Sequence, residues 1–149
     1  MQRLNKLHLI IFIVFMNILV GCVAYYKDYN DFIDNVKPSE IQTTVVHRKF
    51  ISVKQDVASN LKRCFEKSND DMYHAKCKIQ HATSTYFEVS CTKMWGYFKE
   101  DNPAILYYVK LQKVDATHTK ANVYTLGIGT TSLIMDWVQD NHQMCPSIM

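Results

Sequence analysis

The chain has 149 residues, of which 17 are Lys or Arg and 14 are Asp or Glu, giving a formal net charge of +3 at pH 7. Charges of opposite sign alternate along the chain instead of clustering, which argues against nucleic-acid binding because that function relies on a basic patch. Only four Gly and three Pro are present, so the composition also excludes a low-complexity chain.

The chain opens with the pattern of a secretory signal. Arg3 and Lys6 form a short basic start, residues 9–16 are wholly apolar, and Asn17 alone interrupts the run before residues 18–20. An uncleaved transmembrane helix is the alternative, but this segment is shorter than the roughly 20 apolar residues that a membrane span needs. Cleavage after residue 21 leaves 15 basic residues against 14 acidic ones, so we expect a nearly neutral mature protein.

The signal ends in Leu19-Val20-Gly21-Cys22, which resembles the lipobox of bacterial lipoproteins. The resemblance implies that a diacylglyceryl group is attached to Cys22, that signal peptidase II cleaves before it, and that the new amine is acylated. Two or three acyl chains, such as palmitate, would hold the protein on the lipid bilayer almost permanently. Because Val23 and not Asp follows Cys22, the resemblance also implies the outer membrane, with the domain facing the periplasm or exposed at the cell surface.

Residues 22–44 are predicted to be the lipidated N-terminus and a tether. They are polar and aromatic without convincing periodicity, so we expect them to let a folded unit stand off the membrane. A regular pattern begins at Val45, and the remaining length is enough for one compact domain with a modest core. The predicted organisation is a signal peptide at 1–21, a tether at 22–44 and a single α+β periplasmic domain at 45–149.

The domain is predicted to begin with a strand and a helix. Residues 45–53 have the β-branched and aromatic content of a strand. Ser52 and Gln55 have capping-box spacing, and apolar residues then recur at helical spacing at Val57, Leu61 and Phe65. We therefore expect the helix to start at Ser52.

Two β-rich runs, residues 75–80 and 86–92, flank a polar turn and predict a hairpin. A turn centred on Ser84 gives three cross-strand pairs, which are Ile79 with Val89, His81 with Phe87, and Cys77 with Cys91. We expect the second strand of this hairpin to continue through residues 95–98.

The rest of the chain predicts two strands and a helix. Residues 105–111 alternate clearly as a fourth strand, and residues 121–126 form a fifth. The last helix is expected to be capped by Thr130, Thr131 or Ser132 and to carry an apolar stripe at Leu133, Ile134, Trp137 and Val138. The order β-α-β-β-β-β-α predicts an α+β two-layer sandwich, in which an antiparallel sheet of about five strands packs on two helices. This layout resembles helix-grip modules of some envelope-assembly lipoproteins, in topology only.

Four cysteines remain beyond Cys22, and the export signal delivers them to an oxidising compartment. An even number there predicts two disulfides. The hairpin register favours Cys77 with Cys91 and leaves Cys64 for Cys145. The alternative joins Cys64 to one strand cysteine and Cys145 to the other.

No motif supports catalysis or a cofactor. His74, Cys77 and His81 would not converge on one metal ion from a strand, and neither a Cys-x-x-Cys pair nor a nucleophile beside an evident base is present. The aromatic segment with Trp95, Tyr97 and Phe98 has two interpretations, as part of the core or as an interaction surface, because such residues are enriched in binding hot spots. We therefore expect neither a metal nor a cofactor.

The leading hypothesis from sequence is a non-enzymatic, membrane-anchored lipoprotein that binds an envelope protein partner as an assembly, secretion or structural accessory. The alternative is a carrier or sensor that holds a lipid or other apolar ligand between the sheet and the C-terminal helix.

Overall fold

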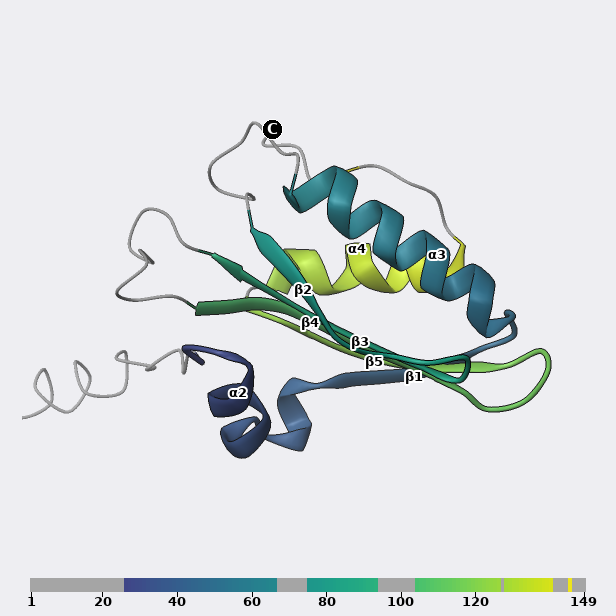
Figure 1. Cartoon of the computed structure of the whole chain (residues 1–149), viewed down its shortest axis with the longest axis horizontal. Helices are drawn as coiled ribbons and strands as arrows, with labels where there is room; N and C mark the ends of the chain where they lie inside the picture. The colour runs from purple at the N-terminus through teal and green to yellow at the C-terminus, as the bar shows by residue number, and fades with distance from the viewer. Residues whose placement is uncertain (1–25, 67–74, 94–103, 127, 141–144, 146–149) are drawn as a thin grey trace, which may run out of the picture.

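The structure, a computed structural model, describes residues 26–66, 75–93, 104–126, 128–140 and 145. They form a five-stranded antiparallel sheet with three α-helices, which confirms the predicted α+β class and the order β-α-β-β-β-β-α from the first strand onward (Figure 1). None of the helices in these ranges combines the length and the apolarity that a membrane span requires.

The sheet contains β1 (Gln42–Val46), β2 (Lys76–Ala82), β3 (Tyr86–Lys93), β4 (Ala104–Lys113) and β5 (Thr119–Thr125). Their spatial order is β1-β5-β4-β3-β2, and each neighbouring pair is antiparallel. Strands β1 and β2 are therefore the two edges. The three central strands carry most of the buried residues, because both of their faces are covered.

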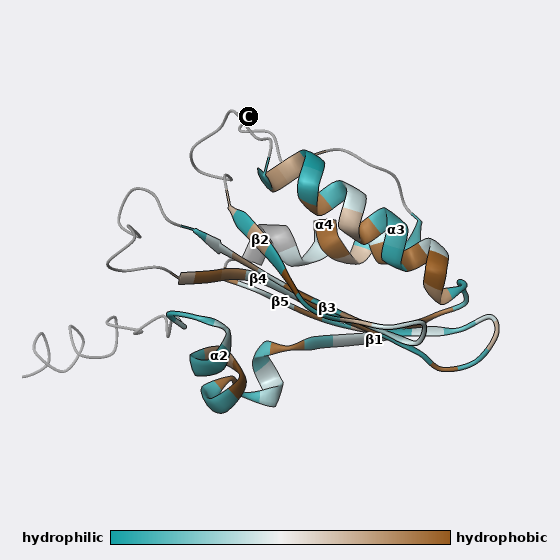
Figure 2. Cartoon of the chain, in the orientation of Figure 1, coloured by the Kyte–Doolittle hydropathy of each residue, from teal (hydrophilic) through white to brown (hydrophobic). Residues whose placement is uncertain are grey.

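Two helices lie together on one face of the sheet, α3 (Phe50–Leu61) and α4 (Ile128–Gln139) (Figure 1). Helix α3 continues as a short π-helical turn (Lys62–Glu66), and hydrophobic and hydrophilic residues alternate along it, as expected of an amphipathic helix (Figure 2). Phe65 is fully buried between the layers, where its ring stacks on Tyr107 at a centroid distance of 4.0 Å and contacts Trp137 at 5.7 Å. This aromatic group and the aliphatic residues around it form the main core.

The predicted helix starts are wrong in both cases. Helix α3 begins at Phe50 after Lys49, not at Ser52, and no side chain caps it. Phe50 and Val53 are buried at helical spacing, so their packing on the sheet overrides the strand propensity of the segment. Helix α4 likewise begins at Ile128, before the residues expected to cap it.

The largest difference from the sequence prediction lies at residues 26–41, which are folded and do not form a tether. Helix α2 (Tyr29–Asn35) and a 3₁₀ turn (Pro38–Glu40) cover the face of the sheet opposite α3 and α4 (Figure 1). Phe32 is fully buried, and with Tyr26, Ile105, Tyr108 and Tyr124 it forms a second cluster of buried residues. The folded unit therefore already includes Tyr26, well before Val45, and the sequence prediction missed the layer on this face.

Two disulfides, Cys64–Cys145 and Cys77–Cys91, are present, the pairing that the sequence favoured. The first links the end of α3 to the C-terminal segment, and the second joins facing residues of the β2–β3 hairpin. In that hairpin the pairing of Ile79 with Val89 is confirmed. His81, however, faces Glu88 and not Phe87, because an irregularity after Ile79 shifts the register by one residue.

Candidate functional site

Several residues singled out from the sequence lie outside the described ranges. They are Cys22, His74, Trp95, Tyr97 and Phe98, so lipidation and the aromatic interaction surface stay predictions. The cysteines of the folded unit are all oxidised in disulfides. Within the described residues no group of three or more His, Cys, Asp or Glu side chains is arranged to hold a metal ion.

Strand β3 presents a different chemistry on each face of the sheet. Phe87, Val89 and Cys91 belong to the main core, so the alternation of the strand turns Glu88 and Ser90 toward α2. Glu88 is only 2% exposed, although it is a carboxylate in the middle of a sheet. A buried carboxylate is costly unless polar groups satisfy it, so its partners define this face.

Tyrosine hydroxyls surround Glu88. Tyr86 donates to one carboxylate oxygen at 2.9 Å, and Tyr108 donates to the other. Burial, followed by a hydrogen bond to Glu88, raises the pKa of Tyr29 to about 12, and the same causes raise the pKa values of Tyr86 and Tyr108. The three phenols therefore remain protonated donors at neutral pH. Because both oxygens of Glu88 are engaged, the cluster is suited to fixing α2 on the sheet and not to proton transfer.

A pocket of about 600 Å³ lies beside this cluster, between the start of α2 and the β2–β3 hairpin. Its lining residues are mostly of polar types, although the carbon atoms of their side chains form most of the lining surface; they are Lys27, Asp28, Tyr29, Asn30, Lys76, Cys77, Lys78, Gln80, Ser90 and Thr92. The side-chain amide of Gln80 donates a hydrogen bond to the Ser90 hydroxyl at 2.7 Å, which fixes the positions of these two lining side chains. We call this the α2 pocket.

The α2 pocket carries an excess of positive charge. Its three lysines, Lys27, Lys76 and Lys78, form no ion pair with any described residue. Its single carboxylate, Asp28, accepts the backbone N–H groups of Asn30 and Asp31 at 2.9 and 3.0 Å and so caps α2. The arrangement favours an anionic ligand.

A second, smaller hollow of about 240 Å³ lies on the other face, between the end of α3 and the edge strand β2. It is lined by Ala58, Leu61, Lys62, Glu66, Cys77, Ile79, Phe87 and Val89, and we call it the β2 groove. Ile79 at its border is 57% exposed, among the most exposed large hydrophobic residues described. Strand β2 pairs with β3 on one side only among the described strands. On its other side the Cys77 N–H donates to the Glu66 carboxylate at 3.2 Å, so the edge is open for strand pairing beyond Cys77.

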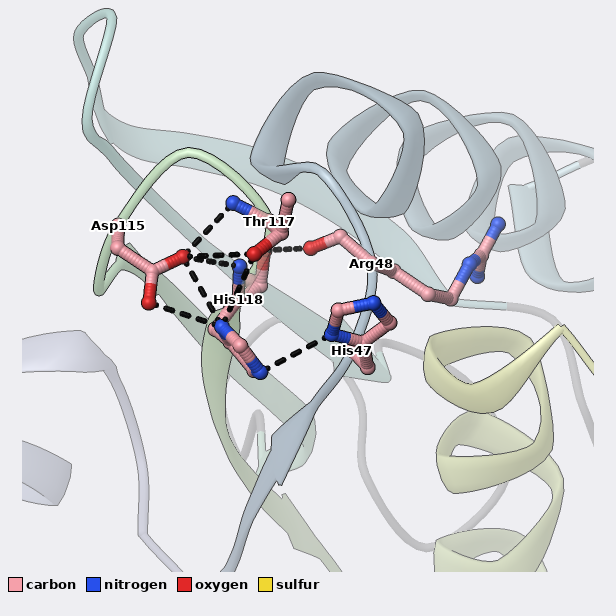
Figure 3. Close-up of polar contacts among 6 residues, drawn as sticks. His47, Arg48, Asp115, Thr117 and His118 are labelled. Carbon is pink, nitrogen blue, oxygen red and sulfur yellow. Dashed lines mark hydrogen bonds and ion pairs between the residues drawn. The ribbon is translucent and has the colours of Figure 1, made fainter.

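A third polar cluster joins the β4–β5 turn to the end of β1 (Figure 3). The His118 Nδ1 atom lies 2.8 Å from Asp115 Oδ2, and its Nε2 atom lies 3.0 Å from His47 Nδ1. Hydrogen bonds from the backbone N–H groups of Thr117 and His118 lower the pKa of Asp115 to about 2. The Thr117 hydroxyl contacts the same His118 nitrogen as Asp115 does, whereas a catalytic triad needs the nucleophile and the carboxylate on opposite nitrogens of the histidine. The cluster holds two loops together.

The sequence reasoning missed the α2 pocket and the Glu88 cluster, although two signals were present. Asp28 stands three residues before Asp31 at the start of α2, and Tyr26, Tyr29 and Phe32 recur at a spacing of three. In β3, polar residues alternate with apolar ones, which signals a second, covered polar face. No protein-family model matches the chain, and no curated protein shows significant similarity to it.

Proposed function

We propose that the protein is a non-enzymatic lipoprotein of the bacterial cell envelope, anchored through Cys22, whose domain binds a protein partner as an assembly, secretion or structural accessory. The observation that carries the proposal is the β2 groove. An open strand edge beside an apolar hollow is the surface on which an extended segment of another protein adds as a further strand.

The β2 groove offers both parts of such a contact. The open edge of β2 supplies backbone donors and acceptors, which give affinity, and the hollow between α3 and β2 accepts an apolar side chain, which gives specificity. The Cys77–Cys91 disulfide fixes one end of β2 on β3, so little order has to be gained on binding. Lys62 and Glu66 add a charge of each sign to the lining.

The alternative, an apolar carrier with its ligand between the sheet and α4, receives less support. Trp137 is 2% exposed, and its ring contacts that of Phe65, which stacks on Tyr107. These three rings fill the space that an apolar ligand would use. The Trp137 indole N–H finds no acceptor among the described residues, a single polar group in otherwise apolar packing.

The partner proposal is tested by site-specific photo-crosslinking in intact cells. A photoreactive residue at Ile79 is compared with the same residue at Val114, which is equally exposed (57% and 56%) but lies beyond the end of β4. We expect one discrete crosslinked protein from position 79 and none from position 114. A product common to both positions, or none at position 79, would contradict docking at β2.

The anchor is tested separately by Cys22→Ser. Without the sulfur no diacylglyceryl group is attached, so we expect an unprocessed precursor that retains residues 1–21. Normal maturation of this variant, read from its mass, would refute the lipoprotein proposal.

A further inference from the structure

We infer that the α2 pocket binds the phosphate of an anionic phospholipid in the same bilayer to which Cys22 is attached. The inference rests on the proposed lipid anchor and goes beyond it, because it assigns a ligand class to a site and an orientation to the domain. It follows from the chain length before the fold, the position of the pocket, and its charge.

The chain between the anchor and the fold is short. Tyr26 lies four residues after Cys22, and four residues span about 14 Å when fully extended. Tyr26 itself is fixed: it is 5% exposed, its ring contacts Phe32 at 5.2 Å, and its carbonyl accepts the Ile105 N–H at 2.7 Å. A lipid on Cys22 therefore keeps the start of α2 close to the bilayer surface.

The α2 pocket lies at this anchored end of the molecule. Lys27 to Asn30 in its wall follow Tyr26 directly in the chain. The opposite wall includes Lys76 and Lys78 at the start of β2, whereas the β4–β5 turn lies at the far end of the sheet (Figure 1). The short connection to Cys22 therefore brings the pocket, and not the opposite end, to the lipid headgroups.

The chemistry of the lining suits a phosphate. Three ammonium groups without ion-pair partners in the described chain stand beside neutral hydrogen-bonding groups, the Ser90 and Thr92 hydroxyls and the Asn30 amide. Ammonium groups act as point charges toward phosphate oxygens, and hydroxyl and amide groups add hydrogen bonds. The acidic groups at the site are Asp28 in the lining and Glu88 beside it, so the three lysines outnumber them and leave an excess of positive charge.

The test uses the full lipidated protein in vesicles and measures how fast each lysine is acetylated, read by mass spectrometry. Three samples are compared: vesicles of phosphatidylcholine, vesicles of phosphatidylcholine with phosphatidylglycerol, and the first vesicles with added inorganic phosphate. The attraction between one lysine and an anionic membrane surface changes the ratio of phosphate-bound to free ammonium groups by about fivefold. We expect acetylation of Lys27, Lys76 and Lys78 to slow about fivefold with phosphatidylglycerol only.

Lys37 and Lys113 are the controls, because both are exposed and lie outside the pocket, Lys37 shortly after α2 and Lys113 beside the β4–β5 turn at the far end. Equal slowing at these controls would overturn the pocket in favour of non-specific attraction. Equal slowing with inorganic phosphate would overturn the lipid as the source, and no slowing in any sample would overturn the site. Protein that fails to float with the vesicles would instead contradict the anchor, so the two failures are distinguishable.

A variant sharpens the result. Lys78→Gln removes one ammonium from the lining but keeps a hydrogen-bonding side chain of similar length at an exposed position. We expect Lys27 and Lys76 to lose most of their protection in this variant, whereas Lys113→Gln leaves it unchanged. Unchanged protection in Lys78→Gln would overturn the shared site.

Discussion

The two faces of the sheet are built on different physical principles. The face under α3 and α4 is packed with aliphatic and aromatic side chains, and the Cys64–Cys145 disulfide closes it. The face under α2 holds tyrosines around a buried carboxylate, with a polar pocket beside it. The first face is a hydrophobic core, whereas the second depends on hydrogen bonds that must be satisfied. Stability is therefore expected to reside mainly in the first, and ligand recognition in the second.

The two disulfides provide the largest expected effect. Cys64–Cys145 spans 81 residues and Cys77–Cys91 spans 14. Because each cross-link lowers the entropy of the unfolded chain, they are expected to stabilise the fold by about 4.5 and about 3 kcal/mol respectively. We expect Cys64→Ser with Cys145→Ser to lower the unfolding free energy more than Cys77→Ser with Cys91→Ser. Urea unfolding of both double variants measures the difference. The reverse order would show that the hairpin, and not the α3–α4 face, limits stability.

A matched pair of phenylalanines compares the two faces directly. Phe65 and Phe32 are both fully buried, one in the main core and one in the α2 cluster. Phe65→Ala is expected to cost about 4 kcal/mol of unfolding free energy, and Phe32→Ala about 3 kcal/mol, because α2 can relax toward the cavity.

Hydrogen exchange gives the decisive readout for this pair. Phe32→Ala should expose the amides of α2 while β3 and β4 stay protected, because α2 is a short outer layer. Phe65→Ala should lower the protection of the whole sheet. Loss of sheet protection in both variants to the same extent would mean that the two faces unfold as one unit.

The elements with a clear period were predicted correctly from the sequence. The hairpin pairing of Cys77 with Cys91, the apolar stripe of α4 and most of the alternation of β4 each place one face against the main core. Ile105 is the exception in β4, because a register irregularity beside it turns it into the α2 cluster. Each of these patterns lies within a short stretch of sequence and reflects packing against one surface, the main core. The predicted fold class follows from their order in the chain.

The missed elements depend on contacts that are distant in sequence. Phe32 stands beside Ile33 in a short, mostly polar helix, and only Phe32 is buried, because Tyr108 and Tyr124 approach it from β4 and β5. Glu88 is tolerated in the sheet because Tyr108 reaches it from the neighbouring strand. A flexible tether and this folded outer layer would have the same amino-acid composition, so hydrophobic periodicity alone could not distinguish between them.

The Glu88 cluster provides the next smaller effect. Tyr108→Phe keeps the ring but leaves one oxygen of a buried carboxylate without its donor, which is expected to cost about 2 kcal/mol of unfolding free energy. Tyr124→Phe is the control, because Tyr124 is also buried on this face but its hydroxyl contacts no described residue by hydrogen bond. Equal losses in the two variants, measured by urea unfolding, would show that the hydrogen bond from Tyr108 to Glu88 adds no stability beyond that of a buried phenol.

The smallest effect at neutral pH comes from the buried tyrosines of the α2 face. Their deprotonation at high pH is expected to destabilise this face. Burial, with the carboxylates of Glu40 and Glu88, raises the pKa values of Tyr26, Tyr29 and Tyr124 to about 12 from an ordinary value of 10. A raised folded-state pKa stabilises the fold fully below pH 10, and this contribution is lost as the pH rises through 12. We therefore expect tyrosinate absorbance to show a delayed group of phenols with a midpoint near pH 12.

Phe32→Ala links this titration to the comparison of the two faces. Phe32 contacts the rings of Tyr26 and Tyr124, so its loss lets water reach both phenols and should move their midpoints toward pH 10. Phe65→Ala serves as the matched control, because Phe65 contacts neither ring and lies under the opposite face. A delayed group that moves equally in both variants, or in neither, would mean that the α2 cluster does not control these tyrosines. A shift confined to Phe32→Ala would show that Phe32 shields these tyrosines from water independently of the main core.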